Sequence, residues 1–462
     1  MSRTRGSFVV LLLWAALYLP WLGSSDLRSE EGHRVMPAFE MMQSGDYLVP
    51  RVAGQLYLRK PPLINWIVAA SFRLCGGWNE WSARLPSALA LLALALFMVV
   101  GGREFLGARG AFAGAIACLT SLGLIEKGRM IEIEAIYVSL FGFAFLSWLF
   151  CWQARKSPWI TWTMPWIFLG LGLLAKGPAL LIFFYAPVVG VLWQTRQLRE
   201  LRRPAHFVGL FIMSAIFLAW AWPYSRAIDA QMISHTWQSE LVMRLNGGEN
   251  TFIYWLENFP TALSYFLPFG LFLPFINCSR MPANRAPIAR GLFYGVVVPS
   301  IFVLLLPGAI ARYVLPAVVP AACVFGCAIE ADAFAWRWFP AKLAWISAGV
   351  TLLGAMIIFP ARSATTLRHH PGFSAQAAVV NAAVPASETI YAVDPGFQPY
   401  FLYLHSRVRY LKTLSELPTN AHYFVVRRGL AKIVEANFHG HLLARTTRYR
   451  GQITLLYARK SP

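Results

Sequence analysis

Charged side chains occur at four places in this chain where apolar residues surround or follow them. Two adjacent glutamates, Glu30 and Glu31, lie in the segment SEEGHR. The other charges lie at the edges of later apolar runs, namely Glu132, Glu134, Lys176 and Arg312. A charge well inside a membrane helix costs about 2.5–3.5 kcal/mol on insertion scales, so such residues need partners and usually line a polar cavity. Adjacent acids alone are common in solvated loops, so Glu30 and Glu31 indicate a functional site only when the charges at the other three places are considered with them.

A cavity that combines paired carboxylates with several cations is suited to group transfer. A carboxylate can act as general base towards an acceptor hydroxyl, which typically accelerates a reaction about 10²–10⁴-fold. Cations can stabilise a phosphate leaving group while its negative charge develops. A sugar linked to a lipid phosphate supplies such a leaving group at a membrane surface. Lys176 has no acid near it in the sequence, so we expect its partner to come from another segment or from a ligand.

Each later charge also has a purely structural explanation. Lys176 can extend its ammonium group to the membrane surface, but Gly177 interrupts the helix beside it and favours a functional role. Glu132 can cap or solvate a helix start, so we prefer Glu134 as the functional acid. Arg312 fits a marker of the membrane boundary as well as it fits a phosphate ligand.

The composition predicts an integral membrane protein. Hydrophobic residues make up 57% of the chain and charged residues only 13%, whereas soluble domains have about 25% charged residues. An ordinary soluble enzyme is therefore excluded. The net charge is +20, but the basic residues lie in short loops between apolar runs, as membrane topology rules expect. We therefore predict membrane lipids rather than nucleic acid as the surroundings.

Apolar segments long enough to cross a bilayer recur along the first 361 residues. About eleven are visible, and we expect about 11–13 spans, at 7–23, 85–102, 110–126, 135–152, 159–175, 178–193, 205–223, 260–277, 291–308, 313–329 and 343–360. We interpret the first as a retained membrane helix, because no small-residue cleavage site follows it. The predicted fold is mainly α, a polytopic transmembrane helix bundle.

The distribution of Lys and Arg predicts which loops face outward. If the N-terminus is cytoplasmic, every second connection is short and basic, and the charges described above fall in the opposite set. That set comprises loops 24–84, 127–134, 176–177, 224–259 and 309–312. We therefore predict two domains, a transmembrane domain of residues 1–361 with a long outer loop at 24–84, and a small extracytoplasmic α/β domain of residues 362–462. Its expected elements are a helix at 374–383 and strands at 389–393, 407–411, 423–427 and 453–458.

The ordered motifs of the chain resemble the aminoarabinose transferase and protein O-mannosyltransferase-like glycosyltransferases, glycosyltransferase family 83 of the GT-C superfamily. The resemblance covers nearly the whole length. In the first loop it rests on SEEGHR, GDYLVPR, YLRKPPL and RLPS. Later motifs are GRMIEIEA, LLAKGPALL, the stretch from Trp237 to Leu245, and ARYVLPAVVP. Any one of these is weak, whereas the ordered set is specific.

The resemblance implies an inverting glycosyltransferase that uses a polyprenyl (undecaprenyl) phosphate sugar at the periplasmic face of a bacterial inner membrane. The acceptor is expected to be a lipid, a glycan or a protein. The implied catalytic residues are Glu30, Glu31 and Glu134. The implied donor phosphate ligands are Lys60, Arg59, Lys176, Arg244, Arg312 and Arg34.

Several positions depart from the family pattern. Glu30 stands where the family usually has Asp, and His33 stands where Arg is frequent, although Arg34 follows. Some members carry residues linked to a metal at positions that are Arg59 and Leu241 here, so we predict no metal and no other cofactor.

Two other functions remain open from the sequence. A transporter or flippase of a lipid-linked sugar needs polar residues along the whole path and often shows inverted repeats, and the sequence shows no such repeat. An inactive relative that scaffolds other glycan enzymes is a third hypothesis. The retained acids together with Lys60 and Lys176 argue against it.

Overall fold

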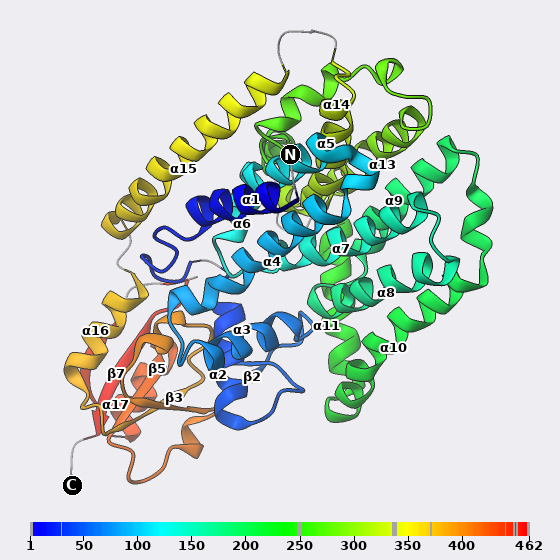
Figure 1. Ribbon diagram of the computed structural model, residues 1–462. Coiled ribbons are helices and arrows are strands. Elements are labelled where there is room, and N and C mark those ends of the chain that lie inside the picture. The colour runs from blue at the N-terminus through cyan, green and yellow to red at the C-terminus, as the bar shows by residue number, and fades with distance from the viewer. Residues whose placement is uncertain are drawn as a thin grey trace.

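A computed structural model shows a helix bundle with a small sheet domain at one end (Figure 1). It describes residues 3–28, 30–246, 252–334, 340–369, 372–438, 440–446, 449 and 451–459. The predicted fold class, a mainly α bundle with a C-terminal α/β region, is confirmed.

Apolar helices, most of them long, form the bundle. They are α1 (Arg3–Tyr18), α4 (Glu80–Gly101), α5 (Arg103–Thr120), α6 (Leu122–Gly128), α7 (Glu134–Gln153), α8 (Pro158–Ala175), α9 (Ala179–Gln194), α10 (Pro204–Ala227), α13 (Ala286–Leu304), α14 (Val318–Glu330) and α15 (Pro340–His369). Two helix pairs cross at glycines, α9 with α13 at Gly190 and Gly291, and α5 with α14 at Gly110 and Gly326. A Cβ on Gly291 would lie 2.5 Å from the Gly190 carbonyl carbon. Small residues at such crossings let membrane helices approach closely.

Fewer helices pass a length and hydropathy criterion for membrane spans than the sequence predicts. In the described part of the chain, six do so, and the pair α5 and α6, bent by 60°, would make a seventh. Part of the difference is length, because α1 and α9 have only 16 residues each. The predicted span at 260–277 is wrong. There α12 (Phe252–Ser264) ends, and a 3-10 segment, η2 (Phe269–Phe275), follows beside Pro268 and contains Pro274, because proline disfavours a continuous helix.

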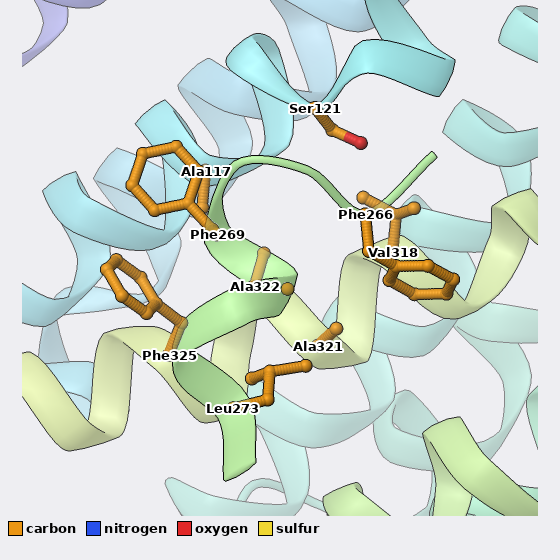
Figure 2. Close-up of a pocket in the computed structure, with 10 residues that line it drawn as sticks. Ala117, Ser121, Phe266, Phe269, Leu273, Val318, Ala321, Ala322 and Phe325 are labelled. Carbon is orange, nitrogen blue, oxygen red and sulfur yellow. The ribbon is translucent and has the colours of Figure 1, made fainter. Parts of the chain in front are cut away.

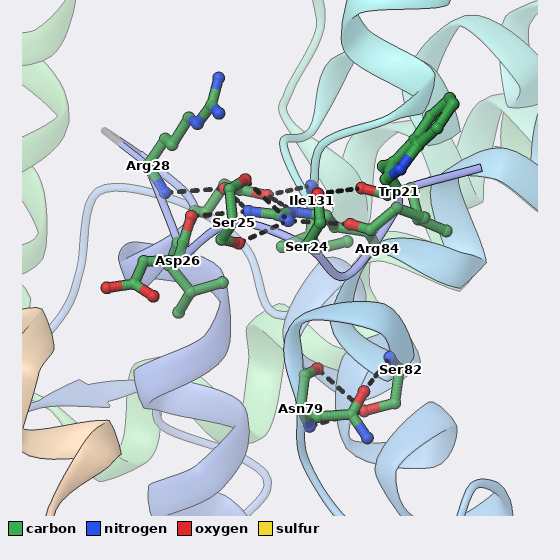
Figure 3. A network of polar contacts seen from close by, with 12 residues as sticks. Trp21, Ser24, Ser25, Asp26, Arg28, Asn79, Ser82, Arg84 and Ile131 are labelled. Carbon is green, nitrogen blue, oxygen red and sulfur yellow. Dashed lines mark hydrogen bonds and ion pairs between the residues drawn. The ribbon is translucent and has the colours of Figure 1, made fainter. Parts of the chain in front are cut away.

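The first outer loop is compactly folded. It contains α2 (Gly32–Ser44), a short hairpin of β1 (Arg51–Val52) and β2 (Gln55–Leu56), and α3 (Leu63–Leu74). The loop ends in a capping box, in which the Asn79 side chain accepts from the Ser82 backbone N–H and the Ser82 hydroxyl accepts from the Asn79 N–H (Figure 3). This cap starts α4, so the loop leads rigidly into the bundle.

The C-terminal region is a five-stranded sheet of order β4-β3-β5-β7-β6 with two helices. Its elements are α16 (Phe373–Ala383), β3 (Thr389–Val393), β4 (Arg407–Leu411), β5 (Tyr423–Arg427), α17 (Ala431–Asn437), β6 (Gly440–Arg445) and β7 (Thr454–Arg459). Strand β3 pairs parallel with β4 and β5, and β7 pairs antiparallel with β5 and β6. The sequence did not indicate β6, because this edge strand is mostly exposed and lacks a clear alternation. The predicted domain boundary at 361/362 falls inside α15, which continues beyond its apolar stretch to His369.

A small apolar void lies between α5, η2 and α14, beside Ala117, Phe269 and Phe325 (Figure 2). Its volume is about 10 Å³, which is at most the room of one water molecule. The void is therefore a packing imperfection rather than a ligand site.

Candidate active site

A polar cavity of about 230 Å³ lies where the first loop, the start of α7, the α8–α9 connection and the 3-10 segment η4 (Ala311–Ala317) meet. Seven of the nine predicted site residues line it, namely Glu30, Arg34, Arg59, Lys60, Glu134, Lys176 and Arg312. The lining also includes Tyr57, Glu132, Glu240 and Tyr313. Five cationic and four carboxylate side chains thus face one cavity, a net charge of +1. Segments far apart in the sequence converge here.

Glu132 and Glu134 form the centre of the ionic cluster. Glu134 Oε1 lies 3.1 Å from Lys176 Nζ and 3.2 Å from Arg312 Nε. Glu132 Oε2 lies 3.1 Å from Lys127 Nζ and 3.4 Å from Arg312 Nη1. The side chains of Glu132 and Glu134 are only 4% and 6% exposed, so these ion pairs have little contact with water. Burial and the nearby Glu134 carboxylate raise the pKa of Glu132. We call Glu30, Lys60, Glu132, Glu134, Lys176 and Arg312 the cavity cluster.

Lys176 is held by the end of helix α8. The helix stops at Ala175, and Gly177 has a φ of +130°, a backbone conformation that favours glycine. The Lys176 ammonium lies 4.6 Å from the ring centre of Tyr313 and 5.4 Å from that of Tyr137. Aromatic faces attract cations at such distances. Glu134 confirms the prediction that another segment supplies the partner of Lys176. The Lys176 ammonium group therefore forms an ion pair and does not simply extend to the membrane surface.

Lys60 and Arg59 reach Glu240, which lies on helix α11 (Ala230–Asn246). Lys60 Nζ is 3.2 Å from Glu240 Oε2, and Arg59 Nε is 3.7 Å from Glu240 Oε1. The Lys60 side chain is 21% exposed and that of Arg59 is 69% exposed, so Lys60 is the better enclosed of the two. Sequence reasoning missed Glu240. Its only signal was its place in the stretch from Trp237 to Leu245.

One further predicted phosphate ligand, Arg244, also lies on α11. Its side chain is outside the described residues, so its assignment stays a prediction.

Glu31 does not line the cavity, although the sequence pattern predicts it as catalytic. Arg84 Nε and Nη2 donate to its two carboxylate oxygens, each over 2.8 Å. The backbone N–H groups of Arg28 and Ile131 also donate to it, over 2.7 and 2.9 Å (Figure 3). The Arg84 side chain donates in addition to the carbonyl oxygens of Leu22 and other residues before Glu31. We call Glu31 and Arg84 with these backbone partners the anchor network. The Glu31 side chain is fully buried, and its oxygens are occupied by protein donors.

Glu30 lies on the cavity side of the same turn. Its side chain is 29% exposed, and its Oε2 is 3.4 Å from Nδ1 of His33. Because the adjacent Glu31 is anchored, the backbone of this turn is fixed and Glu30 is directed into the cavity. The neighbouring acids therefore have different environments, which residue type alone does not reveal.

Comparisons with known proteins agree with this architecture. Residues 59–222 match the family model described as dolichyl-phosphate-mannose-protein mannosyltransferase. The structure is similar to that of ArnT from Cupriavidus metallidurans bound to undecaprenyl phosphate, with a TM-score of 0.73 at 17% identity, over 98% of this chain and 97% of that one. This likeness shows that the two chains share a fold. The chain is a multi-span membrane protein.

Curated proteins similar to this chain include undecaprenyl phosphate-alpha-4-amino-4-deoxy-L-arabinose arabinosyl transferases. That of Pseudomonas savastanoi pv. phaseolicola is 24% identical over 340 residues, covering 71% of this chain and 62% of the relative. That of Shewanella sediminis is 26% identical over 336 residues, covering 70% and 59%. The chain thus spans about three fifths of the length of these relatives. They are transferases, which gives the transporter hypothesis no support.

A second cavity, of about 300 Å³, adjoins the first. Glu132 and Arg312 line both, so these two side chains separate the cavities. The second cavity is also lined by cations, among them Arg28 and Arg129, and by Phe359 of α15. Two polar cavities that share a wall can hold two substrates next to each other.

No group of three or more His, Cys, Asp or Glu side chains suited to a metal ion occurs among the residues that the structure describes. At the cavity, Arg59 stands beside Lys60, and a cation is unsuited to bind a metal. The side chain of Leu241 is outside the described residues.

Proposed function

We propose that this chain is an inverting glycosyltransferase that moves a sugar from a polyprenyl phosphate, such as undecaprenyl phosphate, to a lipid, glycan or protein acceptor. The supporting observation is the cavity itself, in which cations from the first loop, the α8–α9 connection and η4 face carboxylates. The relatives named above are undecaprenyl phosphate arabinosyl transferases, which supports this donor class.

In this proposal, Lys60 and Lys176 bind the donor phosphate, and Arg312 supports them. Arg34, Arg59 and Arg244 are further candidates. Hydrogen bonds to charged groups contribute about 1.5–3 kcal/mol each, so a few such contacts give useful affinity. Lys60 contacts Glu240 without a ligand, and a phosphate would replace or share that contact.

Glu30 is the proposed general base. Its carboxylate takes the proton of the acceptor hydroxyl while the hydroxyl oxygen attacks the anomeric carbon of the donor sugar. The bond between that carbon and the phosphate oxygen breaks, the polyprenyl phosphate leaves with the bonding electrons, and the anomeric configuration inverts. Lys60 and Lys176 stabilise the charge that develops on the leaving group. Glu134 orients Lys176 and Arg312, and Glu31 positions the turn.

The proposal also assigns the acceptor and the side of the membrane. The second cavity adjoins the first at Glu132 and Arg312, so an acceptor there would reach the donor. The distribution of Lys and Arg supports a reaction at the periplasmic face of a bacterial inner membrane. Residues 362–462 are then a periplasmic domain attached to the transmembrane domain of residues 1–361.

The test is sugar transfer by the full chain reconstituted in vesicles with undecaprenyl phosphate-linked sugars. We expect transfer by the wild type and a loss of about 10–100-fold for Lys60→Ala, because a charged hydrogen bond of about 1.5–3 kcal/mol disappears. The matched control is Arg73→Ala, which removes a cation of the same loop that contacts Tyr47 instead of the cavity.

Two results would contradict the proposal. One is a wild type that transfers no sugar from any polyprenyl phosphate donor but moves the lipid-linked sugar between leaflets, as a flippase would. The other is Lys60→Ala with the activity of Arg73→Ala. Mass spectrometry of lipids and surface glycans from a deletion strain would then identify the acceptor.

A further inference from the structure

The C-terminal sheet domain packs directly against the turn that carries Glu30. Phe397 follows β3, and its ring stacks on the His33 ring with centroids 3.6 Å apart and planes 24° apart. A Cβ on Gly32 would lie 2.9 Å from Phe397 Cζ and 3.1 Å from Pro399 Cγ. A larger residue than glycine would therefore push the two domains apart at this point.

His33 connects this interdomain contact to the proposed base. Its Nδ1 lies 3.4 Å from Glu30 Oε2, and its side chain is only 13% exposed. A second ring, that of Tyr57, lies 5.5 Å away from it. A carboxylate only accepts hydrogen bonds, so the contact with Glu30 is favourable when Nδ1 carries the proton. The two rings thus hold the imidazole beside Glu30, and the 3.4 Å contact becomes an ion pair when the imidazole is protonated.

The segment that presents Phe397 is itself held firmly. Asp394 and Gly396 have φ values of +40° and +68°, and a Cβ on Gly396 would lie 2.5 Å from Gln452 Oε1. The Asp394 carboxylate accepts from Arg427 of its own domain over 2.9 Å and from Gln55 of the first loop over 2.7 Å. A non-glycine residue at positive φ persists only where the surroundings impose it. The position of Phe397 is therefore determined within the sheet domain, by the Asp394–Arg427 contact and the close packing at Gly396.

We propose that His33 is a positioning residue for Glu30, and that Phe397 is the residue through which the C-terminal domain controls the rate of transfer. This inference rests on the proposed function. Lys60 lies later in the first loop, after α2 and the hairpin, and Lys176 lies between α8 and α9, so the His33–Phe397 stack affects the placement of the base and leaves donor affinity unchanged.

The experiment compares kcat and donor KM of the full-length variants His33→Leu, His33→Asn and Phe397→Leu. His33→Leu removes the imidazole that lies against Glu30, and we expect kcat to fall about 10-fold or more, since small misplacements of a catalytic group can cost up to about 10²-fold. Donor KM stays near the wild-type value. His33→Asn recovers most of the rate, because its amide N–H takes the place of Nδ1–H.

Phe397→Leu removes the stacked ring and should lower kcat less than His33→Leu does. The double variant should be no slower than His33→Leu alone, since coupled residues give non-additive effects. The matched control is Gln55→Ala, which removes the interdomain hydrogen bond to Asp394 but not the stack, and should keep the wild-type kcat.

His33→Leu with wild-type kcat, or with a changed KM only, would overturn the inference. Independent, multiplying effects of the two single variants would also overturn it, as would equal losses in Phe397→Leu and Gln55→Ala. If His33→Leu fails to fold, the comparison of Phe397→Leu with Gln55→Ala decides. Failure of the proposed function is a different result, namely absence of transfer by the wild type.

Discussion

The cavity cluster and the anchor network both pair glutamate with arginine, yet their side chains are used differently. In the anchor network, Glu31 and Arg84 are nearly inaccessible, and protein groups bind both oxygens of the carboxylate. In the cavity cluster, the side chains of Glu30, Lys60 and Arg312 remain 21–29% exposed and line the cavity. Burial of an ion pair therefore does not by itself distinguish a ligand-binding residue from a structural one. The two differ in whether the side chain can still bind a ligand, beyond its contacts within the protein.

The largest effect expected from this comparison is on the rate of transfer. Glu30→Gln removes the proposed base but keeps the size of the side chain, so transfer should fall about 10²–10⁴-fold. The melting temperature should stay at the wild-type value, because Glu30 lies outside the anchor network. A transfer assay and a thermal melt of the same preparation check both. A stable, fully active Glu30→Gln protein would remove Glu30 from the site.

The opposite result is expected for the anchor network. Arg84→Met leaves Glu31 as a buried, uncompensated carboxylate, which should lower the free energy of unfolding by about 3–5 kcal/mol. Arg59→Met is the control, since that side chain is 69% exposed. Denaturation of both variants in detergent is the measurement. Equal stability of the two would mean that the anchor network does not hold the loop.

Another carboxylate of the first loop, Glu40, should make the stability of the protein depend on pH. It accepts from the backbone N–H groups of Ala53 over 2.6 Å and Gly54 over 3.2 Å and has no arginine clamp comparable to that of Glu31. Burial raises the pKa of Glu40 to about 7, against opposing contributions from these two hydrogen bonds and from Arg51.

The raised pKa fixes the direction of the pH effect. Between the unfolded pKa of 4.5 and about 7, the folded state binds more protons than the unfolded state. Stability should therefore fall as the pH rises through this window, by at most about 3.4 kcal/mol at 1.36 kcal/mol per pKa unit, and level off above it. Melts from pH 4.5 to 8 of the wild type and Glu40→Gln test this. The variant should show a smaller fall, and parallel curves would contradict the assignment.

The smallest effect concerns the pair of Lys60 and Glu240. Glu240→Gln removes a partner that competes with a phosphate for Lys60, so undecaprenyl phosphate should bind up to about 5-fold more tightly, as expected for a partly exposed pair of about 0.2–1 kcal/mol. Glu257→Gln, an exposed acid on α12, is the control. Weaker binding by Glu240→Gln would show instead that Glu240 supports the bound state.

The fold could be predicted largely because its signals are local. Apolar runs and Lys/Arg placement indicate the bundle, and four of the five strands of the C-terminal sheet follow from short β-branched and aromatic runs. Failures occurred where tertiary context decides. Prolines interrupt the apolar stretch at 260–277, and strand β6 at the sheet edge is mostly exposed.

The candidate site could be predicted only in part. An isolated charge such as Lys176 is visible in the sequence because apolar neighbours make it costly, and it does find an acid partner. The sequence could not separate Glu30 from Glu31, because their difference depends on Arg84, which lies 53 positions after Glu31. Nor could it connect Glu240 with Lys60, a contact across 180 positions.

The most direct test of the proposed donor site is a cryo-EM structure of the full chain with undecaprenyl phosphate. We expect the phosphate to bind in the cavity of about 230 Å³, with its oxygens about 2.7–2.9 Å from Nζ of Lys60 and of Lys176. The Glu31–Arg84 contact should be unchanged. A phosphate bound instead in the second cavity, beside Arg28 and Arg129, would contradict the account.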